Sequence, residues 1–336
     1  MKKLLAVSAL LAISGTSVAM AEDVNVYSYR QPFLVQPMFD AFTEETGIKV
    51  NVMFSDKGLT ERLLQEGEFS PADIILTTDI SRLVELKDKN VVQAVESEVI
   101  SSNIPEQYRD SENEWFALTL RTRSVYSSRD RIGRLGDDFD YMDLAKPEWQ
   151  GKICTRSGKH PYNVSLVSSV IAHYGEEEAK AWLEGLKANL ARRPQGNDRA
   201  QVRAVSEGLC DLALGNSYYL GAMVNDQEQK AWADAVHINF PGQNSKGTHI
   251  NVSGMSMAKY APNEENALKL MEFLTGDRAQ QMYAEVNFEY PAKLGVPRSE
   301  LVASWGEFAA DTLPLEVIAE NHSAAMKLLD EVRFDL

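Results

Sequence analysis

Strand-like and helix-like segments alternate along the first part of the chain, and this alternation limits the possible folds more than any other feature. Strand patterns cover residues 23–29, 48–54 and 72–79, and amphipathic helix patterns cover residues 33–46 and 58–66 between them. Strands that alternate with helices in this order form parallel sheets with helices on their faces. The sequence therefore predicts an α/β lobe built on a mainly parallel sheet.

A second α/β alternation begins near residue 130 and continues to about residue 235. The apolar, extended stretch 115–128 leads into it, and the strand patterns at 236–240 and 248–252 are expected to return to the first lobe. A chain that crosses twice between two lobes creates a cleft that can close on a ligand. We therefore predict the two-lobed periplasmic-binding-protein fold, with hinge crossovers between the lobes.

The lobes are expected to be discontinuous in sequence, with the ligand cleft between them. We expect lobe 1 to contain residues 22–119 and about 247–300, and lobe 2 to contain residues 120–246 and about 301–336. The later part of the chain also carries three helix patterns, at residues 263–275, 277–286 and 315–332.

The N-terminal residues have the three parts of a secretory signal. Met1-Lys2-Lys3 is basic, residues 4–18 are mostly apolar, and Ala19-Met20-Ala21 has the small-residue form of a cleavage site. We predict that residues 1–21 are a cleavable signal peptide and that the mature chain is soluble and periplasmic. The residue directly after the predicted cleavage site is not a cysteine, so we do not expect a lipid-anchored form.

Charge and cysteine content exclude some functions. The formal charge is −15, from 34 basic and 49 acidic residues, and loss of Lys2 and Lys3 would leave 32 against 49, or −17. Such an acidic chain is unsuited to binding nucleic acid or anionic lipid. The two cysteines, Cys154 and Cys210, are expected to form a structural disulfide in an exported chain, and without nearby histidines they do not make a zinc site.

Tyr218 and Tyr219 follow an apolar strand pattern at residues 209–214 and a Gly-Asn-Ser turn. Ser217 is a suitable N-cap for a helix expected over residues 219–233, so both tyrosines would lie in its first turn. The free N–H groups and the helix dipole at that point favour negative charge. One interpretation is that the tyrosines are metal ligands, because a hard trivalent cation would remove the phenol protons. The plainer interpretation is that paired tyrosines pack at the sheet edge with solvated hydroxyls.

Tyr162 belongs to a second strand–turn–helix segment, in which Pro161 suits the first position of a helix that continues to residue 173. Cys154 lies eight residues before Tyr162, and Cys210 lies eight residues before Tyr218. If the cysteines face each other on neighbouring strands in register, three phenol oxygens approach one point at the carboxyl ends of the strands. Three phenolates would carry three negative charges, which is the charge of a ferric ion.

The chain resembles the ferric-iron-binding proteins that serve bacterial ABC transporters, the bacterial transferrins of the two-lobed solute-binding superfamily. The resemblance covers nearly the whole mature chain, and the separated tyrosine with the tyrosine pair is its most specific element. The segments that carry it are Val26-Tyr27-Ser28-Tyr29-Arg30, residues 115–123, Gly151-Lys152-Ile153-Cys154, Tyr162-Asn163-Val164-Ser165-Leu166, Gly215-Asn216-Ser217-Tyr218-Tyr219, residues 247–254 and Asn287-Phe288-Glu289-Tyr290-Pro291.

The resemblance implies that Tyr162, Tyr218 and Tyr219 are phenolate ligands of Fe³⁺. It also implies delivery of the iron to a permease and ATPase in the inner membrane, with no reaction performed on a substrate. We expect the protein to act as a monomer.

The resemblance further implies a synergistic anion, commonly carbonate or bicarbonate. Some family members add a histidine and a fourth tyrosine directly after the arginine of the first motif, but this chain has Gln31 and Pro32 there. In members that lack these two ligands, an anion fills the open coordination positions and is held by arginines. The positions of those arginines match Arg30 and Arg121 in this chain. A guanidinium fork suits a planar oxyanion, and Arg123 competes with Arg121 for the second place.

Other polar residues near these motifs have plainer interpretations. Arg30 and Arg121 would otherwise form surface or interlobe ion pairs. Strand alternation makes at least one of Tyr27 and Tyr29 a packing residue. His160 would contact a ligand residue at most, because the five histidines share no metal-ligand spacing.

Asp79 is interpreted in a similar way, as a solvated carboxylate at a strand end that could line the opposite cleft wall.

Two other functions stay open at the level of sequence. One is a binding protein for another anion or small organic solute, such as phosphate, thiamine or a polyamine. The other is an exported hydrolase, against which stands the absence of G-x-S-x-G, H-E-x-x-H and any supported Ser-His-Asp set in the sequence.

Overall fold

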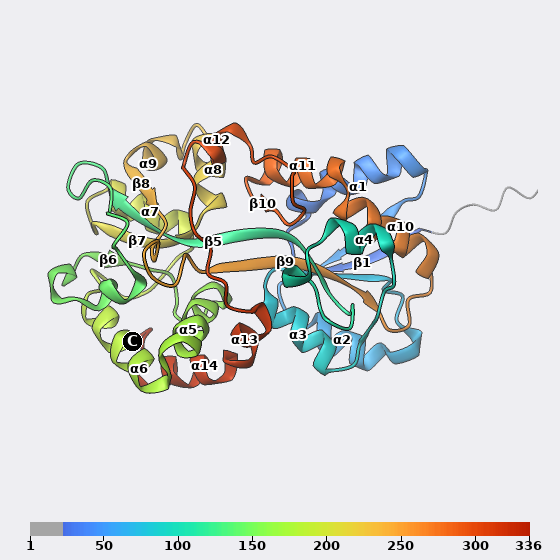
Figure 1. The fold of residues 1–336 in the computed structure, drawn as a ribbon, viewed down its shortest axis with the longest axis horizontal. Helices are drawn as coiled ribbons and strands as arrows, with labels where there is room; N and C mark the ends of the chain where they lie inside the picture. The colour runs from blue at the N-terminus through green and yellow to red at the C-terminus, as the bar shows by residue number, and fades with distance from the viewer. Residues whose placement is uncertain (1–22) are drawn as a thin grey trace, which may run out of the picture.

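The computed structural model describes residues 23–336, so the predicted signal peptide lies outside the described residues. The chain forms two α/β lobes that lie side by side, with strands β5 and β9 running between them (Figure 1). The predicted two-lobed α/β fold is therefore confirmed. Among residues 23–336, no helix combines the length and the apolar character that crossing a membrane requires.

The described strands belong to one continuous sheet with the main order β2-β1-β3-β9-β5-β7-β6. Their bounds are β1 (Val24–Ser28), β2 (Val50–Phe54), β3 (Ile74–Thr77), β4 (Val92–Gln93), β5 (Phe116–Ser128), β6 (Ile153–Cys154), β7 (Leu212–Asn216), β8 (Val236–Asn239), β9 (Ile250–Ala258) and β10 (Tyr290–Pro291).

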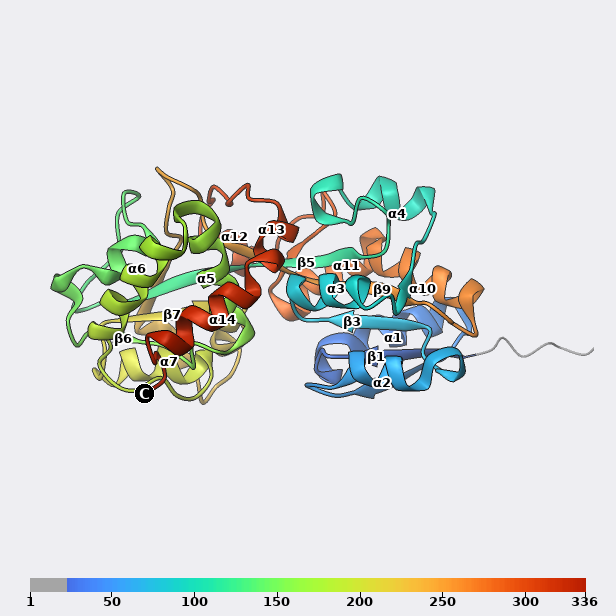
Figure 2. The same cartoon turned by 90° about the horizontal axis from the view of Figure 1, so that it is seen from below.

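Helices cover both faces of the sheet (Figure 2). Their bounds are α1 (Pro32–Thr46), α2 (Leu59–Glu66), α3 (Ile80–Asp88), α4 (Glu98–Asn103), α5 (Pro161–Tyr174), α6 (Glu176–Ala188), α7 (Asp198–Ser206), α8 (Tyr218–Val224), α9 (Lys230–Asp234), α10 (Glu264–Thr275), α11 (Asp277–Asn287), α12 (Glu300–Ala303), α13 (Leu315–Glu320) and α14 (His322–Glu331).

The sheet is mixed rather than mainly parallel, which corrects one detail of the prediction. Strand β1 pairs in parallel with β2 and β3, and β6 pairs in parallel with β7, as strand–helix alternation requires. The other pairings in the described chain involve β5 or β9 and are antiparallel. The reason is that β5 leaves the first lobe and β9 returns to it, so the two crossing strands run in opposite directions.

The long strands connect separate hydrophobic cores. Phe116 and Leu118 at the start of β5 belong to the first-lobe core, whereas Val125 near its end belongs to a core of the second lobe. Strand β9 returns through Val252 to the first-lobe core. Strand β8 does not return, contrary to expectation, because its Ile238 packs in the second lobe and the strand pairs with the far end of β5.

The segment after residue 300 is shared between the lobes. A single helix was expected over residues 315–332, but α13 and α14 divide this stretch, because they pack on different cores. Leu315 and Ile318 of α13 belong to the first-lobe core, and Leu328 of α14 belongs to the second. Helix α13 contacts both α3 and α5 (Figure 2). We propose the lobe boundaries given above for the rest of the chain, with α13 packed on the first-lobe core as a link between the lobes.

Candidate metal centre

The disulfide joins the two strand–turn–helix segments that carry the tyrosines. Cys154 and Cys210 are bonded, with their Cα atoms 5.9 Å apart, so the predicted disulfide is confirmed. The expected register between the cysteines is wrong, however. Cys154 of β6 lies opposite Ala213 of β7, and Cys210 precedes that strand. The crosslink therefore connects the end of one strand to the loop that enters its neighbour.

Two of the phenol hydroxyls nevertheless come together, and the third tyrosine lies beside them. The hydroxyl oxygens of Tyr162 and Tyr218 are 3.2 Å apart, and the ring centroids of Tyr218 and Tyr219 are 4.3 Å apart. The loop that follows β6 is longer than the turn that follows β7, which offsets the register difference. All three tyrosines thus line one side of a cleft.

Helix α8 is shorter than predicted, and Ser217 does not cap it. The backbone of Ser217 is already helical, and its hydroxyl accepts a hydrogen bond from the backbone N–H of Thr122 instead. The helix ends at Val224 because Asp226 accepts hydrogen bonds from the backbone N–H groups of Glu228 and Gln229 and forms a turn. Tyr218 still opens the helix, as predicted.

Tyr162 lies in the first turn of α5, where Pro161 occupies the expected early position. The N-cap is His160, whose Nδ1 accepts a hydrogen bond from the backbone N–H of Tyr162 at 3.3 Å. Burial lowers the pKa of His160 to about 3, and the Arg156 charge adds to this effect. His160 is therefore neutral at physiological pH, which lets Nδ1 accept.

The cleft has a volume of about 680 Å³ and receives residues from both lobes. Its second-lobe wall includes Tyr162, Tyr218 and Tyr219. The residues that complete its lining include Tyr29, Arg30, Gln31, Phe33, Phe54, Asp56, Arg82, Arg156, His160, Arg199 and Phe288. The lining thus contains four arginines and a single carboxylate, and carboxylates outside the lining pair with Arg30 and Arg156.

Burial controls the acidity of the tyrosine pair. Desolvation raises the pKa of the Tyr218 phenol well above its ordinary value, and the neighbouring Tyr162 and Tyr219 add to this shift. Desolvation also raises the pKa of Tyr219, and the nearby Tyr162 and Asp198 add to that shift. The helix start does not outweigh desolvation, so both phenols keep their protons at neutral pH.

Arg30 is buried and already has a partner. Its Nη2 donates to Oε2 of Glu289 at 2.7 Å, and both side chains are almost fully buried. Arg30 also lines the cleft. The structure therefore combines the two interpretations of this residue, since Arg30 lines the cleft while its guanidinium forms an ion pair. Glu289 was not predicted to take part.

Arg121 differs from Arg30 because it has no acidic partner. Its Nη1 donates to Ser253 Oγ at 3.1 Å, and its Nη2 donates to the carbonyl oxygen of Thr78. Its guanidinium carbon lies 5.3 Å from the centre of the Tyr162 ring. No carboxylate in residues 23–336 lies within ion-pair distance of it, although the side chain is buried. Arg121 is therefore a buried positive charge beside the tyrosines.

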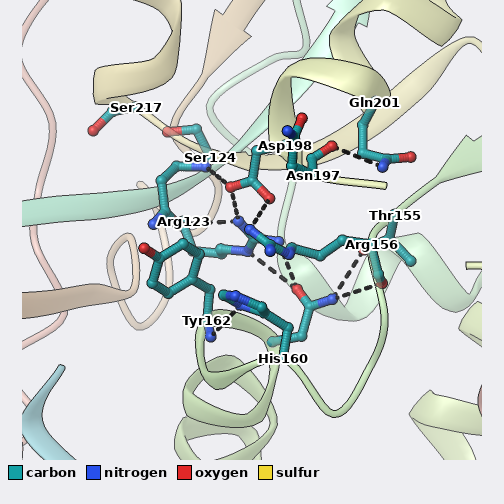
Figure 3. A network of polar contacts seen from close by, with 12 residues as sticks. Arg123, Ser124, Thr155, Arg156, His160, Tyr162, Asn197, Asp198, Gln201 and Ser217 are labelled. Carbon is teal, nitrogen blue, oxygen red and sulfur yellow. Dashed lines mark hydrogen bonds and ion pairs between the residues drawn. The ribbon is translucent and has the colours of Figure 1, made fainter. Parts of the chain in front are cut away.

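Arg123 is engaged in a buried network behind Tyr162 (Figure 3). Its Nη1 donates to Asp198 Oδ2 at 2.6 Å, and its Nη2 donates to Asn163 Oδ1 at 2.6 Å. Arg156 donates to the other oxygen of Asp198 at 3.2 Å. Burial opposes ionisation of Asp198, but the charges of Arg123 and Arg156 outweigh it and lower the carboxyl pKa.

The guanidinium carbons of Arg156 and Arg123 lie 5.3 and 6.0 Å from the centre of the Tyr162 ring. Together with Arg121, three guanidinium groups surround this ring, and one carboxylate, Asp198, offsets their charge. Sequence reasoning missed Asp198, because an acidic residue in the first turn of a helix normally faces solvent. No local pattern identifies its partner, which lies 75 residues away.

The hydroxyls of Tyr27 and Tyr29 form hydrogen bonds within the first lobe. The Tyr29 hydroxyl accepts hydrogen bonds from the backbone N–H groups of Leu59 and Thr60, at the start of α2. The Tyr27 hydroxyl donates to Glu66. Both residues are buried, so both pack, where at least one was expected to.

Asp79 is buried rather than solvated. It caps α3 by accepting a hydrogen bond from the backbone N–H of Arg82.

One other group of potential metal ligands occurs within residues 23–336, formed by Asp110, Glu112 and Glu114. The ammonium of Lys87 already occupies its centre, at 2.8 Å from carboxylate oxygens of Asp110 and Glu112. This group is an ion-pair network and lies apart from the cleft residues.

Comparisons with known proteins place these features in context. Residues 69–307 match the family model described as bacterial extracellular solute-binding protein. The chain is 41% identical over 313 residues to iron uptake protein A1 of Synechocystis sp., covering 92% of this chain and 87% of that one.

Two solved structures are also similar. The apo ferric ion-binding protein A of Pasteurella haemolytica is 56% identical, with a TM-score of 0.91 and coverage of 94% of this chain and 99% of that one. A Trichodesmium protein solved in complex with iron and citrate ligands is 38% identical, with a TM-score of 0.86 and coverage of 93% and 99%. The fold and the sequence are thus similar to these proteins over nearly their whole lengths.

Proposed function

The chain belongs to the bacterial extracellular solute-binding protein family, and from this premise we propose that it binds Fe³⁺ in the periplasm and delivers it to an ABC importer. Two of the similar proteins are named for iron uptake or for ferric ion binding, and a third was solved in complex with iron and citrate. We propose the same cargo for this chain, carried without chemical conversion by a monomer whose partners are an inner-membrane permease and ATPase.

The observation that carries the proposal is the 3.2 Å approach of the Tyr162 and Tyr218 hydroxyls in the cleft, with the Tyr219 ring tilted against the Tyr218 ring beside them. Phenolate oxygens are hard ligands and suit a hard ion. Binding of Fe³⁺ would release three phenol protons, and the three phenolates would then neutralise the metal charge. The bound ion would thereby offset the desolvation that otherwise keeps the Tyr218 and Tyr219 phenols protonated.

A synergistic anion completes the proposed site. Arg121, Arg123 and Arg156 surround Tyr162, and Asp198 offsets one of their charges. Two positive charges remain after the three phenolates have neutralised Fe³⁺, which suits a dianion such as carbonate. We propose Arg121 as its principal holder, because this guanidinium has no carboxylate partner. Arg30 would contribute less, because Glu289 already binds it.

Lobe closure would follow binding. The second lobe supplies the tyrosines and the first lobe supplies Arg30 and Gln31, so the cargo bridges the two walls. Strands β5 and β9 connect the lobes and would bend as the cleft closes. The closed, loaded form is the one that we expect the permease to recognise.

The test is a titration of the purified mature protein with ferric citrate in bicarbonate buffer. We expect a visible phenolate-to-iron charge-transfer band, and we expect the Tyr218→Phe/Tyr219→Phe variant to lack it. Tyr174→Phe is the matched control, because Tyr174 lies at the far end of α5 from Tyr162. A protein that stays colourless with excess ferric citrate would contradict the proposal.

A second candidate function is the binding of an organic anion without metal. The cleft favours it through its volume of about 680 Å³ and its lining of Arg30, Arg82, Arg156 and Arg199 against Asp56 alone. Calorimetry with citrate and with phosphate, each in the presence of a metal chelator, separates the two functions. Heat of binding under these conditions would favour the organic or inorganic anion as cargo.

A further inference from the structure

We propose that Asp335 is a positioning residue for Tyr162, which it holds in place through the loop that precedes α5. This inference rests on the proposed role of Tyr162 as an iron ligand. The loop, residues 155–160, connects the disulfide strand β6 to the helix that begins with Pro161 and Tyr162. We call it the Tyr162 loop.

Asp335 binds the outer side of the Tyr162 loop with both carboxylate oxygens. Ser157 donates its hydroxyl proton to Oδ2 at 2.6 Å, and the backbone N–H of Gly158 donates to Oδ1 at 2.7 Å. Hydrogen bonds to a carboxylate are short and strong compared with neutral ones. Two adjacent residues of the loop are therefore fixed by one side chain that is distant in sequence.

The neighbouring Phe334 adds a close packing contact. It is buried in the second-lobe core together with Leu214 and Leu329. A Cβ atom at Gly158 would lie 2.6 Å from Cδ1 of Phe334 and 2.8 Å from Cδ2 of Leu329, so glycine alone allows this approach. The backbone carbonyl of Asp335 also accepts a hydrogen bond from Arg193 Nε at 2.6 Å. The carboxylate thus approaches the loop from an anchored segment.

The inner side of the loop is bound to the tyrosine helix. The side-chain amide of Asn163 lies within hydrogen-bond distance of Thr155 Oγ1 and of the carbonyl oxygens of Arg156 and Ser157. Nδ1 of His160 accepts a hydrogen bond from the backbone N–H of Tyr162. The loop is therefore held between Asp335 and the first turn of α5. Loss of the Asp335 contacts would release the loop on one side. Only the contacts of Asn163 and His160 would then hold the loop to the start of α5.

The test compares two substitutions of Asp335 in the full mature chain. Asp335→Ala removes both acceptors, whereas Asp335→Asn keeps an acceptor for the Gly158 N–H and a polar partner for the Ser157 hydroxyl. We expect Asp335→Ala to weaken ferric binding about tenfold, measured by competition with citrate in bicarbonate buffer. Asp335→Asn is expected to stay within about twofold of the parent, because it preserves the geometry without the charge.

Two further variants separate positioning from other effects. In a Tyr162→Phe background, Asp335→Ala should cause no additional loss, since the residue through which it acts is gone. Asp330→Ala is the matched control: it removes a carboxylate whose ion pair with Lys159 of the same loop is exposed, and it should leave the affinity unchanged.

Each contrary outcome has a distinct meaning. Equal losses in Asp335→Ala and Asp335→Asn would overturn the inference, because the residue would then act by its charge on the metal. A parent-like Asp335→Ala, or an equal loss in the Tyr162→Phe background, would overturn it as well. Absence of the charge-transfer band in the parent protein would instead contradict the proposed function.

Discussion

Two pairs of tyrosines follow or end a strand in this protein, one in each lobe, and they have opposite surroundings. The hydroxyl of Tyr27, in β1, donates to Glu66, and the hydroxyl of Tyr29, directly after β1, accepts hydrogen bonds at the start of α2. The Tyr218 hydroxyl lies 3.2 Å from the hydroxyl of Tyr162, a residue of the same kind, and Tyr219 lies beside Tyr218. The difference shows that hydroxyl availability, rather than the presence of a tyrosine at a strand end, distinguishes a candidate ligand from a packing residue.

The nearby charges differ in the same way. In the first lobe, Arg30 is matched by Glu289 and Arg82 lies near Asp79. In the second lobe, three guanidinium groups surround the Tyr162 ring and share one carboxylate. The first wall is electrostatically complete, whereas the second wall has an excess of positive charge that phenolates and an anion would satisfy.

The largest expected effect comes from removing a ligand in the second lobe and comparing it with the first. Tyr162→Phe should weaken ferric binding by more than the roughly 10–100-fold that is typical of outer contacts to a metal site. Tyr27→Phe/Tyr29→Phe should leave the affinity and the charge-transfer band in place. Citrate competition measures both. Equal losses from the two lobes would remove the distinction between the pairs.

Acidification is expected to have the next largest effect. The pKa values of Tyr218 and Tyr219 are raised above the ordinary value of 10.0, so iron must displace their protons at every pH below it. Affinity should therefore rise with pH and fall on acidification, by up to about tenfold per released proton for each pH unit. Conditional dissociation constants measured between pH 6 and 8 give the number of protons. A flat profile would show that phenols do not bind the metal.

Substitutions of the arginines should differ in their effect on iron binding, as substitutions of the tyrosines do. Arg121→Gln is expected to weaken iron binding about tenfold in bicarbonate and to abolish the bicarbonate enhancement, because it removes an unpaired charge from the proposed anion site. Arg278→Gln removes an equal charge from an exposed ion pair and is the control. An unchanged bicarbonate dependence in Arg121→Gln would show that a residue other than Arg121 holds the anion.

Arg30→Gln should act mainly on stability, since it leaves Glu289 buried without its partner. Loss of one member of a buried pair costs about 3–5 kcal/mol. Urea unfolding measures this loss, and the Arg30→Gln/Glu289→Gln variant should recover much of it. A large loss of iron affinity with unchanged stability would instead favour Arg30 as the principal anion holder.

The smallest expected effect belongs to Tyr29. Tyr29→Phe removes the acceptor of two backbone N–H groups at the start of α2 and should lower the free energy of unfolding by about 1–3 kcal/mol. Iron affinity should not change. Urea unfolding together with citrate competition tests both statements, and a selective loss of affinity would return Tyr29 to the candidate ligands.

Local patterns were sufficient for much of the fold. Strand–helix alternation predicted the two lobes, and Pro161 with the helical pattern behind it predicted the position of Tyr162. The convergence of Tyr162 and Tyr218 was predicted from a register that is wrong, because loop lengths are not encoded in the cysteine spacing. The meeting of the hydroxyls therefore depends on loop geometry that the spacing alone does not contain.

The partners of buried charges could not be predicted, because they depend on contacts distant in sequence. Asp198 lies 75 residues from Arg123, and Glu289 lies 259 residues from Arg30. Each acid occupies an ordinary local position, and only the folded topology brings it to its arginine. The division of residues 315–332 into α13 and α14 has a similar origin, because it results from packing on two different lobes.

The Cys154–Cys210 bond has a consequence for when the protein becomes competent. It links the segment that leads to Tyr162 with the segment that leads to Tyr218, across 56 residues. Reducing compartments keep thiols apart, and oxidising ones allow them to couple. Under the proposed function, newly made chains in the cytosol would lack this crosslink, and we expect the iron site to form only after secretion, so that it does not sequester iron inside the cell.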